Sequence, residues 1–321
     1  MIGKVDPDSL AALVLGRTGA PDERVLQGPA YGEDTAAIEL EGGILVVNAD
    51  PISLAVGRVG TLGVDVAAND VAASGADPEW LTSVVFLPGS DDALDTITEQ
   101  LDEAARRLGI AIVGGHSEYA PALSTPMLVL TCFGLADRYV PTGGAEPGDR
   151  LVLTKGAGIE ATAILATDFR DRLAGEVDDA TFEAAEGFYD EVSVVPEAAV
   201  LREHANAMHD PTEGGLVDGL LELAVASGVR LEVDRDAIPV REETRRLCAA
   251  AGVDPLRTFG SGALLAAVPE ESTAAALSGL EERGIDAAVI GTVRESGEPV
   301  LDLGGDRFEE PVRDDMYALW E

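Results

Sequence analysis

The stretch "VGTLGVDVAANDVAASGA", residues 59–76, decides how the rest of this chain is interpreted. Its apolar residues recur at steps of three and four, which is the spacing of one face of an α-helix. Asp70 falls on this apolar stripe, whereas Asp65 falls on the opposite, polar side. The pattern therefore predicts a helix that carries Asp70 inward and leaves Asp65 on the surface.

An inward Asp70 needs a partner. A buried carboxylate is costly unless it is paired with a cation or bound to a metal. The chain contains only two lysines, Lys4 and Lys155, so a metal cation is a reasonable partner. A hydrogen bond to neighbouring backbone or an ion pair with an arginine explains Asp70 equally well, and the helix alone does not decide between these interpretations.

Strand-like apolar runs alternate with helical patterns on both sides of this helix. Strands are expected at 44–50, 81–87, 110–115, 127–136, 150–155, 263–268, 287–293 and 299–304, and helices at 91–109, 158–168, 181–192, 197–206 and 211–227. The Gly- and Pro-rich stretch "VPTGGAEPGDR" (140–150) is the best boundary. The alternation predicts an α/β protein with two mixed-sheet domains, 1–145 and 146–321.

The charge of the chain is strongly negative. It has 22 Lys+Arg against 59 Asp+Glu, a formal net charge of -37. Such a field repels nucleic acids and anionic membranes, so neither is expected as a partner. The acids are scattered rather than blocked, which predicts a solvated acidic surface of the kind found in halophilic organisms. A functional carboxylate must therefore be identified by its position.

The cysteines and the N-terminus indicate the compartment. Cys132 and Cys248 are far apart and lack any zinc-site spacing, so a disulfide scaffold or zinc site is not expected. The start "MIGKVDPDSL" does not have the pattern of a signal peptide, and no apolar run reaches the length of a membrane span. We expect a cytoplasmic protein.

Two further aspartates lie where a ligand could approach. Asp34 sits in the Gly-flanked turn of "GPAYGEDTAAIEL" (28–40), and glycines let a backbone approach a ligand closely. Asp50 ends the strand-like run "ILVVNAD" (44–50), and ligands of α/β sheets bind at strand ends. Both are also ordinary turn positions for aspartate, so each by itself favours a turn.

Two glycine motifs could hold phosphate. "IVGGHSEYAP" (112–121) places His116 and Glu118 after a Gly pair, which suits a phosphate cradle, although a lone His is weak evidence for acid–base chemistry. "LVLTKGAGIEATAILA" (151–166) contains G-x-G-x-x-A, a weak match to a dinucleotide fingerprint because no acidic residue ends a following strand. Lys155 precedes this glycine turn, where an anion could sit.

The stretch "MHDPTEGGL" (208–216) has two interpretations. Asp210 is an ideal N-cap, Pro211 suits the first helical position, and Glu213 completes a capping box, so the stretch predicts the start of a helix. This leaves Gly214 and Gly215 unexplained, because glycines weaken a first helical turn. They suit close approach of a ligand or of another backbone. Alone, the stretch favours a cap over a site.

Together and in this order, these motifs resemble the aminoimidazole ribonucleotide (AIR) synthetase superfamily. Its members include that purine enzyme, thiamine-monophosphate kinase, selenophosphate synthetase and the hydrogenase maturation protein HypE. The matching blocks are "GEDTAAI", "NAD" (48–50), "AANDVAASGADPEWL", "IVGGHSEYAPAL", "GDRLVLTKGAGIEATAILA", "MHDPTEGGLVDGLLELA" and "FGSGALLAAV". They cover nearly the whole chain. "HDPTEGGL" and the run 238–268 are most similar to the HypE-like branch.

The resemblance implies two AIR synthetase-type α/β domains, with N-terminal domains pairing in a homodimer. It implies ATP in a cleft between the domains, with phosphates held through Mg²⁺ by aspartates, and Mg²⁺ does prefer oxygen ligands. Matched residue by residue, it assigns the metal to Asp34, Asp50, Asp70 and Asp210, the nucleotide cradle to Asn69, Gly114, Gly115, Lys155 and Thr212, and acid–base chemistry to His116 or Glu118.

The acceptor stays open. HypE proteins end in a cysteine that carries the group being dehydrated, whereas this chain ends "DDMYALWE", so that reaction on its own tail is not expected. The leading expectation is an enzyme that uses ATP to phosphorylate, and so activate, an amide or carbonyl oxygen of a small or protein-borne acceptor. The alternatives are a kinase resembling thiamine-monophosphate kinase, a catalytically inactive nucleotide-binding maturation partner, and a dehydrogenase based on "GAGIEA".

Overall fold

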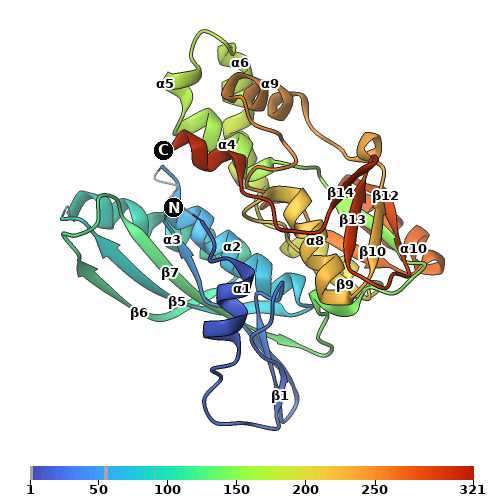
Figure 1. Ribbon diagram of the computed structural model, residues 1–321. Helices are drawn as coiled ribbons and strands as arrows, with labels where there is room; N and C mark the ends of the chain where they lie inside the picture. Colours follow the sequence, from blue (N-terminus) through green and yellow to red (C-terminus); the bar gives the residue numbers. More distant parts are fainter. Residues whose placement is uncertain (1–2, 54–56, 90) are drawn as a thin grey trace.

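The computed structural model describes residues 3–53, 57–89 and 91–321. These residues form two seven-stranded mixed sheets, each with its own helices (Figure 1). The expected α/β class with two mixed sheets is confirmed. All strands of the first sheet precede residue 137, and all strands of the second follow residue 149.

The first sheet has the strand order β1-β2-β3-β7-β5-β6, with β4 also paired to β7. Its strands are β1 (Val25–Gln27), β2 (Ala36–Leu40), β3 (Gly43–Val47), β4 (Asp50–Ile52), β5 (Asp77–Leu87), β6 (Ala111–Tyr119) and β7 (Met127–Ala136). All neighbours are antiparallel except β5 and β6, which α3 (Asp91–Leu108) connects. Buried residues alternate along β7, so one face of the sheet packs on the core.

The second sheet has the strand order β14-β13-β10-β12-β8-β11-β9. Its strands are β8 (Arg150–Thr154), β9 (Ala207–His209), β10 (Arg230–Val233), β11 (Leu265–Val268), β12 (Ala287–Arg294), β13 (Val300–Leu303) and β14 (Asp306–Phe308). β8, which precedes "GAGIEA", is antiparallel to both β11 and β12. A dinucleotide fold needs parallel strands at this point, so the topology argues against the dehydrogenase.

Helices cover both sheets. The longer ones are α2 (Val59–Ala73), α3, α4 (Ile159–Thr167), α6 (Asp179–Glu186), α7 (Val195–Leu201), α8 (Gly215–Ser227), α9 (Glu242–Ala251) and α10 (Glu270–Glu281). The short ones are α1 (Pro7–Leu10), α5 (Arg170–Leu173) and the turns Ala11–Leu15, Thr142–Gly144, Gly187–Glu191, Arg235–Ala237 and Asp315–Leu319. Within the described residues, no helix is both long and apolar enough to cross a membrane.

Several predicted elements are confirmed and others were missed. The helix expected at 91–109 is α3, which ends just before Gly109, and the strand expected at 127–136 is β7. The short strands β1, β4, β9, β10 and β14 were not predicted. They are three or four residues long, which is too short for a period of two to stand out from a turn.

The expectation that Asp65 lies on the surface is wrong. Its side chain is 0% exposed, and Arg107 of α3 donates to both its oxygens at 2.7 and 2.8 Å. The reason is that α2 is buried on nearly all sides, between the first sheet, α3 and α7. A helix in such a position has no solvent-facing stripe, so its polar side also needs partners. The inward placement of Asp70 is confirmed.

Breaking this pair should destabilise the first sheet's core. Arg107→Met leaves the Asp65 carboxylate buried without a cation, and we expect the free energy of unfolding to fall by about 3 kcal/mol. Denaturant titration at pH 8 measures the change. The double variant Asp65→Asn, Arg107→Met should recover much of the loss, because it leaves no buried charge. A double variant as unstable as the single one would contradict this account.

Candidate functional site

The stretch "MHDPTEGGL" does not begin its helix at Pro211. Helix α8 begins at Gly215, and Gly214 precedes it with φ 82°. The predicted cap by Asp210 is therefore wrong: the Gly214 N–H is capped at 2.8 Å by the carboxylate of Asp314, a residue 100 positions further on. Residues 210–214 form the loop between β9 and α8, so the Asp210 side chain is free for other contacts.

Gly214 and Gly215 were left with two interpretations, close approach of a ligand or of another backbone. A Cβ on Gly215 would lie 2.5 Å from the Thr258 carbonyl oxygen and 2.8 Å from that of Leu256. A Cβ on Gly214 would meet the Asp218 side chain and the Val312 carbonyl oxygen. Of the two interpretations, close approach of another backbone is the one that the structure supports, and both glycines have positive φ values.

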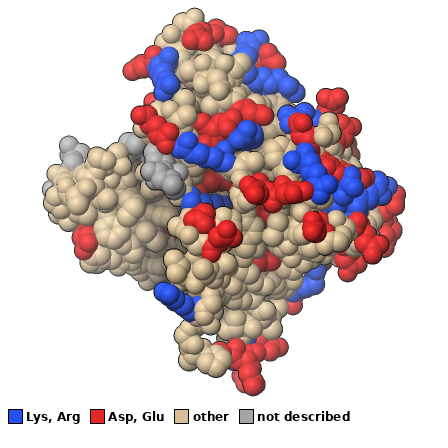
Figure 2. Space-filling view, in the orientation of Figure 1, with Lys and Arg blue, Asp and Glu red and all other residues tan. Residues whose placement is uncertain are grey.

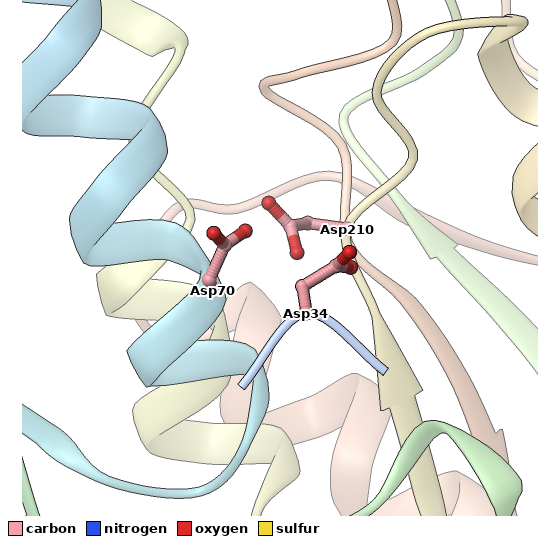
Figure 3. Close-up of side chains that lie close together, drawn as sticks. All are labelled: Asp34, Asp70 and Asp210. Carbon is pink, nitrogen blue, oxygen red and sulfur yellow. The ribbon is translucent and has the colours of Figure 1, made fainter. Parts of the chain in front are cut away.

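Asp34, Asp70 and Asp210 meet at one point of the molecule (Figure 3). They come from the loop before β2, from α2 and from the loop after β9, and one carboxylate oxygen of each lies within 4.8 Å of the others. Asp210 is 1% and Asp70 3% exposed, whereas the Asp34 side chain is 40% exposed. The cluster is thus buried on two sides and open to solvent beside Asp34.

This cluster has the chemistry of a divalent-cation site. Burial, and then the neighbouring carboxylates of Asp50 and Asp210, hold the pKa of Asp70 well above its usual range. Burial and the carboxylate of Asp34 raise the pKa of Asp210 to about 8. Asp210 Oδ2 is buried and has no hydrogen-bond partner. A hard cation such as Mg²⁺ would supply that partner and relieve the repulsion, so these residues fit the ion.

Asp50 lies beside the cluster rather than within it. The Asn48 side-chain amide donates to Asp70 Oδ2 at 2.6 Å and to Asp50 Oδ2 at 3.4 Å. The Asn48 oxygen accepts from the backbone N–H of Cys132 on β7 at 3.0 Å. Asn48 therefore fixes the orientation of Asp70 from the first sheet, a contact that the sequence analysis did not identify although "NAD" contains it.

A cavity of about 440 Å³ opens beside the three aspartates. Its polar side includes Asp34, Asp50, Asp70, Thr212, Glu160 and Glu213, and its apolar side includes Val66, Ile52, Ile164 and Phe259. Lys4 is the one lysine or arginine among its described lining residues. In Figure 2 most red and blue side chains lie over the upper and right-hand parts of the molecule, where the two signs are intermixed.

A buried chain of charged groups lies behind the cluster. His209 Nε2 is 3.0 Å from Glu222, and Lys4 Nζ is 3.2 Å from the other oxygen of Glu222. His209 Nδ1 lies 3.7 Å from Asp34 Oδ2. Burial alone would lower the pKa of His209, but the hydrogen bond to Glu222 raises that pKa to about 9. An imidazolium here offsets part of the carboxylate repulsion.

His209, Lys4 and Glu222 are not among the site residues predicted from the sequence. His209 directly precedes Asp210 in the quoted motif, and Lys4 is one of two lysines, so both carried a signal. Glu222 and Glu160 carried none in an acidic chain. Glu160 begins the first turn of α4 and lines the cavity, and burial raises its pKa to about 7.

Asn69 and Lys155, which were predicted for the nucleotide cradle, do not line the cavity. The Asn69 side chain is buried and bonds the backbone of Val192 and Val194. Lys155 Nζ contacts the backbone oxygens of Glu191 and Ser193 and the carboxylate of Glu197. Both residues have all their polar atoms occupied within the protein. Of the predicted cradle, Thr212 alone lines the cavity.

The glycine motif of β6 also lies away from this cavity. β6 is the outermost strand of the first sheet and is exposed along its length, and among the described strands none pairs with its outer edge. Gly114, Gly115, His116 and Glu118 do not line the cavity of their own chain, and His116 and Glu118 contact each other at 3.1 Å. Gly115 is required locally, since a Cβ there would clash with the Ser83 carbonyl oxygen.

Asp218, one turn into α8, makes a pH-dependent contribution to the free energy of unfolding, and this contribution can be tested. Burial and the nearby Glu222 raise its pKa to about 6, while Oδ1 accepts from Val312 N–H. The unfolded chain gives up this proton near pH 4, so stability falls as pH rises from about 4 to about 6. Asp218→Asn keeps the acceptor oxygen and removes the charge.

We therefore expect Asp218→Asn to exceed the wild type in free energy of unfolding at pH 8, by up to about 3 kcal/mol, and by less at pH 5. Denaturant titrations at the two pH values measure this. An advantage that is the same at both values would contradict the assignment of Asp218 as the titrating group.

Two family models match this chain. "AIR synthase related protein, N-terminal domain" matches residues 32–136, and "AIR synthase related protein, C-terminal domain" matches residues 146–304. The hydrogenase expression/formation protein HupE of Azotobacter chroococcum is 34% identical, over 82% of this chain and 79% of that protein. The carbamoyl dehydratase HypE of Azotobacter vinelandii is 34% identical, over 81% and 78%.

One similar protein has been solved with ATP bound. The crystal structure of hydrogenase maturation protein HypE in complex with ATP is 26% identical to this chain, with a TM-score of 0.68. It covers 95% of this chain, and the match covers 94% of that one. The three aspartates of the cluster all fall within the residues matched by the family models.

Proposed function

This chain belongs to the AIR synthase-related family, and we propose that it is an Mg²⁺-dependent enzyme that uses ATP to phosphorylate, and so activate, an amide or carbonyl oxygen of its acceptor. A relative named carbamoyl dehydratase and a HypE structure holding ATP support this proposal. A carbamoyl group is an amide, which favours an amide acceptor. We propose that its two domains are 1–145 and 146–321.

One observation carries the proposal. Asp34, Asp70 and Asp210 converge beside a cavity of about 440 Å³, with one carboxylate oxygen of each within 4.8 Å of the others. Two of these carboxylates are buried, and like charges at this spacing repel one another unless a cation lies between them. A cation bound there lies at the wall of a cavity large enough for a small ligand. Bound Mg²⁺ would neutralise charge on the transferring phosphoryl group.

The residues of the chain then have distinct tasks. Asp34, Asp70 and Asp210 would hold the cation, which would supply positive charge beside the phosphates. The acceptor oxygen attacks the γ-phosphorus, the bond from the γ-phosphorus to the β–γ bridging oxygen breaks, and ADP leaves. Phe259 and Ile164 form an apolar wall that excludes water. Glu160, which lines the cavity and has a pKa of about 7, is the acid–base group that the cavity offers in place of His116.

Calorimetry and product analysis test the proposal. In high salt, ATP with Mg²⁺ should bind at one site per chain, and binding should be lost without the metal. Incubation with carbamoylated thiols and other primary amides should release ADP in step with acceptor consumption, followed by ³¹P NMR. A stable phosphorylated small molecule would instead indicate a kinase. Binding without turnover would indicate an inactive partner, and no binding of ATP would sink the proposal.

We also propose a homodimer that pairs through the first sheet. Ile112, Val113 and Tyr119 of β6 and Leu135 of β7 are large exposed apolar side chains, and Val113 is 58% exposed. Figure 2 shows the face over β5–β7 almost free of charged side chains, in a chain whose composition is 25% charged. An uncharged patch on an uncovered edge strand is typical of an interface. His116 would then act, if at all, across that interface.

Introducing charge into this patch should separate the protomers. We expect Val113→Arg to run as a monomer in light scattering at about 10 µM, where the wild type runs as a dimer, because a buried unpaired charge weakens an interface by several kcal/mol. Leu26→Arg is the matched control, since Leu26 is an exposed apolar residue of the same sheet on β1, at the opposite edge. A monomeric wild type would refute the dimer.

A further inference from the structure

Residues 191–197 run from the end of the short helix Gly187–Glu191 to the first turn of α7, and side chains from both halves of the molecule bond to them. One set of contacts, the first hold, comes from α2, which packs on the first sheet. The other set, the second hold, comes from the residue after β8 in the second sheet. The residues that provide them, Asn69 and Lys155, have no contact with the cavity. The proposed reaction assigns no role to these two sets of contacts.

Asn69 provides the first hold. It is 0% exposed and directly precedes Asp70 on α2. Its side-chain N–H donates to the Val192 carbonyl oxygen at 2.9 Å, and its side-chain oxygen accepts from Val194 N–H at 2.7 Å. Two bonds from one planar amide to one stretch of backbone fix both the distance and the rotation of α2 at the level of Asp70.

Lys155 provides the second hold. Its ammonium contacts the oxygens of Glu191, Ser193 and Glu197 at 2.6, 2.8 and 2.6 Å, which uses all three donors. Glu197 is 2% exposed, so this is a buried ion pair. The backbone of Lys155 has φ 55°, and it is the one non-glycine residue with positive φ in the described chain. Such a backbone persists where its surroundings over-determine it.

The second hold leads to Asp210 through the sheet. Lys155 follows β8, and Asp210 follows β9. Leu265 of β11 pairs with Leu153 on one side and with His209 on the other, so the ends of β8 and β9 lie at the same edge of the sheet. A continuous path of hydrogen bonds and short stretches of backbone therefore runs from Asp70, through Asn69, residues 191–197, Lys155 and three paired strands, to Asp210.

We infer that Asn69 and Lys155 are positioning residues, which hold Asp70 and Asp210 at the spacing that a shared cation requires. Repulsion between the buried carboxylates favours separation of α2 and β9 when no cation is bound, and this brace opposes it together with the direct packing of α2 on β9. The brace keeps the ligands close in advance, so that less free energy is lost to ordering when the cation binds. This inference rests on the proposed metal site.

Binding of Mn²⁺ alone tests the inference without any turnover. Calorimetry in high salt at 25 °C should show that Asn69→Ser weakens Mn²⁺ affinity by at least about tenfold, as is typical for residues that orient metal ligands. The double variant Lys155→Met, Glu197→Gln should do the same, because it removes the second hold and leaves no charge buried. Either variant decides the question if the other does not fold. Circular dichroism establishes which variants are folded.

Asp65→Asn is the matched control. Asp65 is also buried on α2 and loses a charge-assisted partner when substituted, but its partner is Arg107 of α3 rather than residues 191–197. We expect it to lower stability and to leave Mn²⁺ affinity unchanged. Folded positioning variants whose affinity stays within about twofold of the wild type would overturn the inference. A wild type that binds no Mn²⁺ would overturn the metal site itself, which separates the two failures.

Discussion

Asp70→Asn and Asp210→Asn should each abolish Mg²⁺-dependent ATP binding, with at least a hundredfold loss of Mn²⁺ affinity. Each substitution removes a carboxylate from a three-carboxylate cluster, and an amide is a poor substitute for a charged oxygen ligand of a hard cation; about 3 kcal/mol of lost binding energy corresponds to this factor. Calorimetry with Mn²⁺, then with ATP and Mg²⁺, measures both effects. Loss in both variants would place residues 140 positions apart in one site.

The same variants should gain stability in the absence of metal. The raised pKa values of Asp70 and Asp210 mean that the folded protein resists ionising both groups. Replacing either with Asn removes that repulsion, so the metal-free variant should unfold at higher denaturant than the wild type at pH 9. Asp218→Asn is the control for binding, since it removes a buried carboxylate outside the cluster. Unchanged ATP binding in both cluster variants would refute the metal assignment.

Gly215→Ala should be strongly destabilising, costing at least about 3 kcal/mol in free energy of unfolding. The added Cβ would lie 2.5 and 2.8 Å from two backbone oxygens, of Thr258 and Leu256, and neither can rotate away. Gly215 also has φ 66°, which adds about 1 kcal/mol for any other residue. Because α8 starts here, the loop that carries Asp210 should shift, and Mn²⁺ affinity should fall as well.

Gly228 provides the control for this second prediction. It lies at the other end of α8 with φ 67°, and a Cβ there would meet nothing within 4 Å. Gly228→Ala therefore carries the same backbone strain without the clash, and we expect a cost of about 1 kcal/mol and normal Mn²⁺ binding. Equal losses in the two variants, measured by denaturant titration, would show that backbone strain alone explains Gly215.

Much of the fold was predictable because its signals are local. The long elements α3 and β7 were predicted with nearly correct ends, since their patterns repeat over ten residues or more. The short strands were missed because their pairing partners, not their own residues, make them strands. β9 is such a case: three residues paired to β11 deliver Asp210 to the site.

Some of the predicted site residues lie together in the structure, and others do not. Asp34, Asp70 and Asp210 converge, and Asp50 and Thr212 line the adjoining cavity. Asn69 and Lys155 lie near it in sequence or in the sheet but face residues 191–197 instead. His116 and Glu118 lie on an exposed edge strand. Adjacent residues on a helix or strand point in different directions, so a motif does not say which of its members reaches the ligand.

The sequence by itself determined what depends on near neighbours: the alternation of strands and helices, the inward face of α2 that carries Asp70, and the acidic character of the whole chain. Only the tertiary structure decided which carboxylates meet, that α2 has no solvent side, and that Asp314 rather than Asp210 caps α8. The physical reason is the distance along the chain over which each interaction acts. Helical periodicity depends on residues a few positions apart, whereas the meeting of Asp34, Asp70 and Asp210 depends on how two sheets and their helices pack.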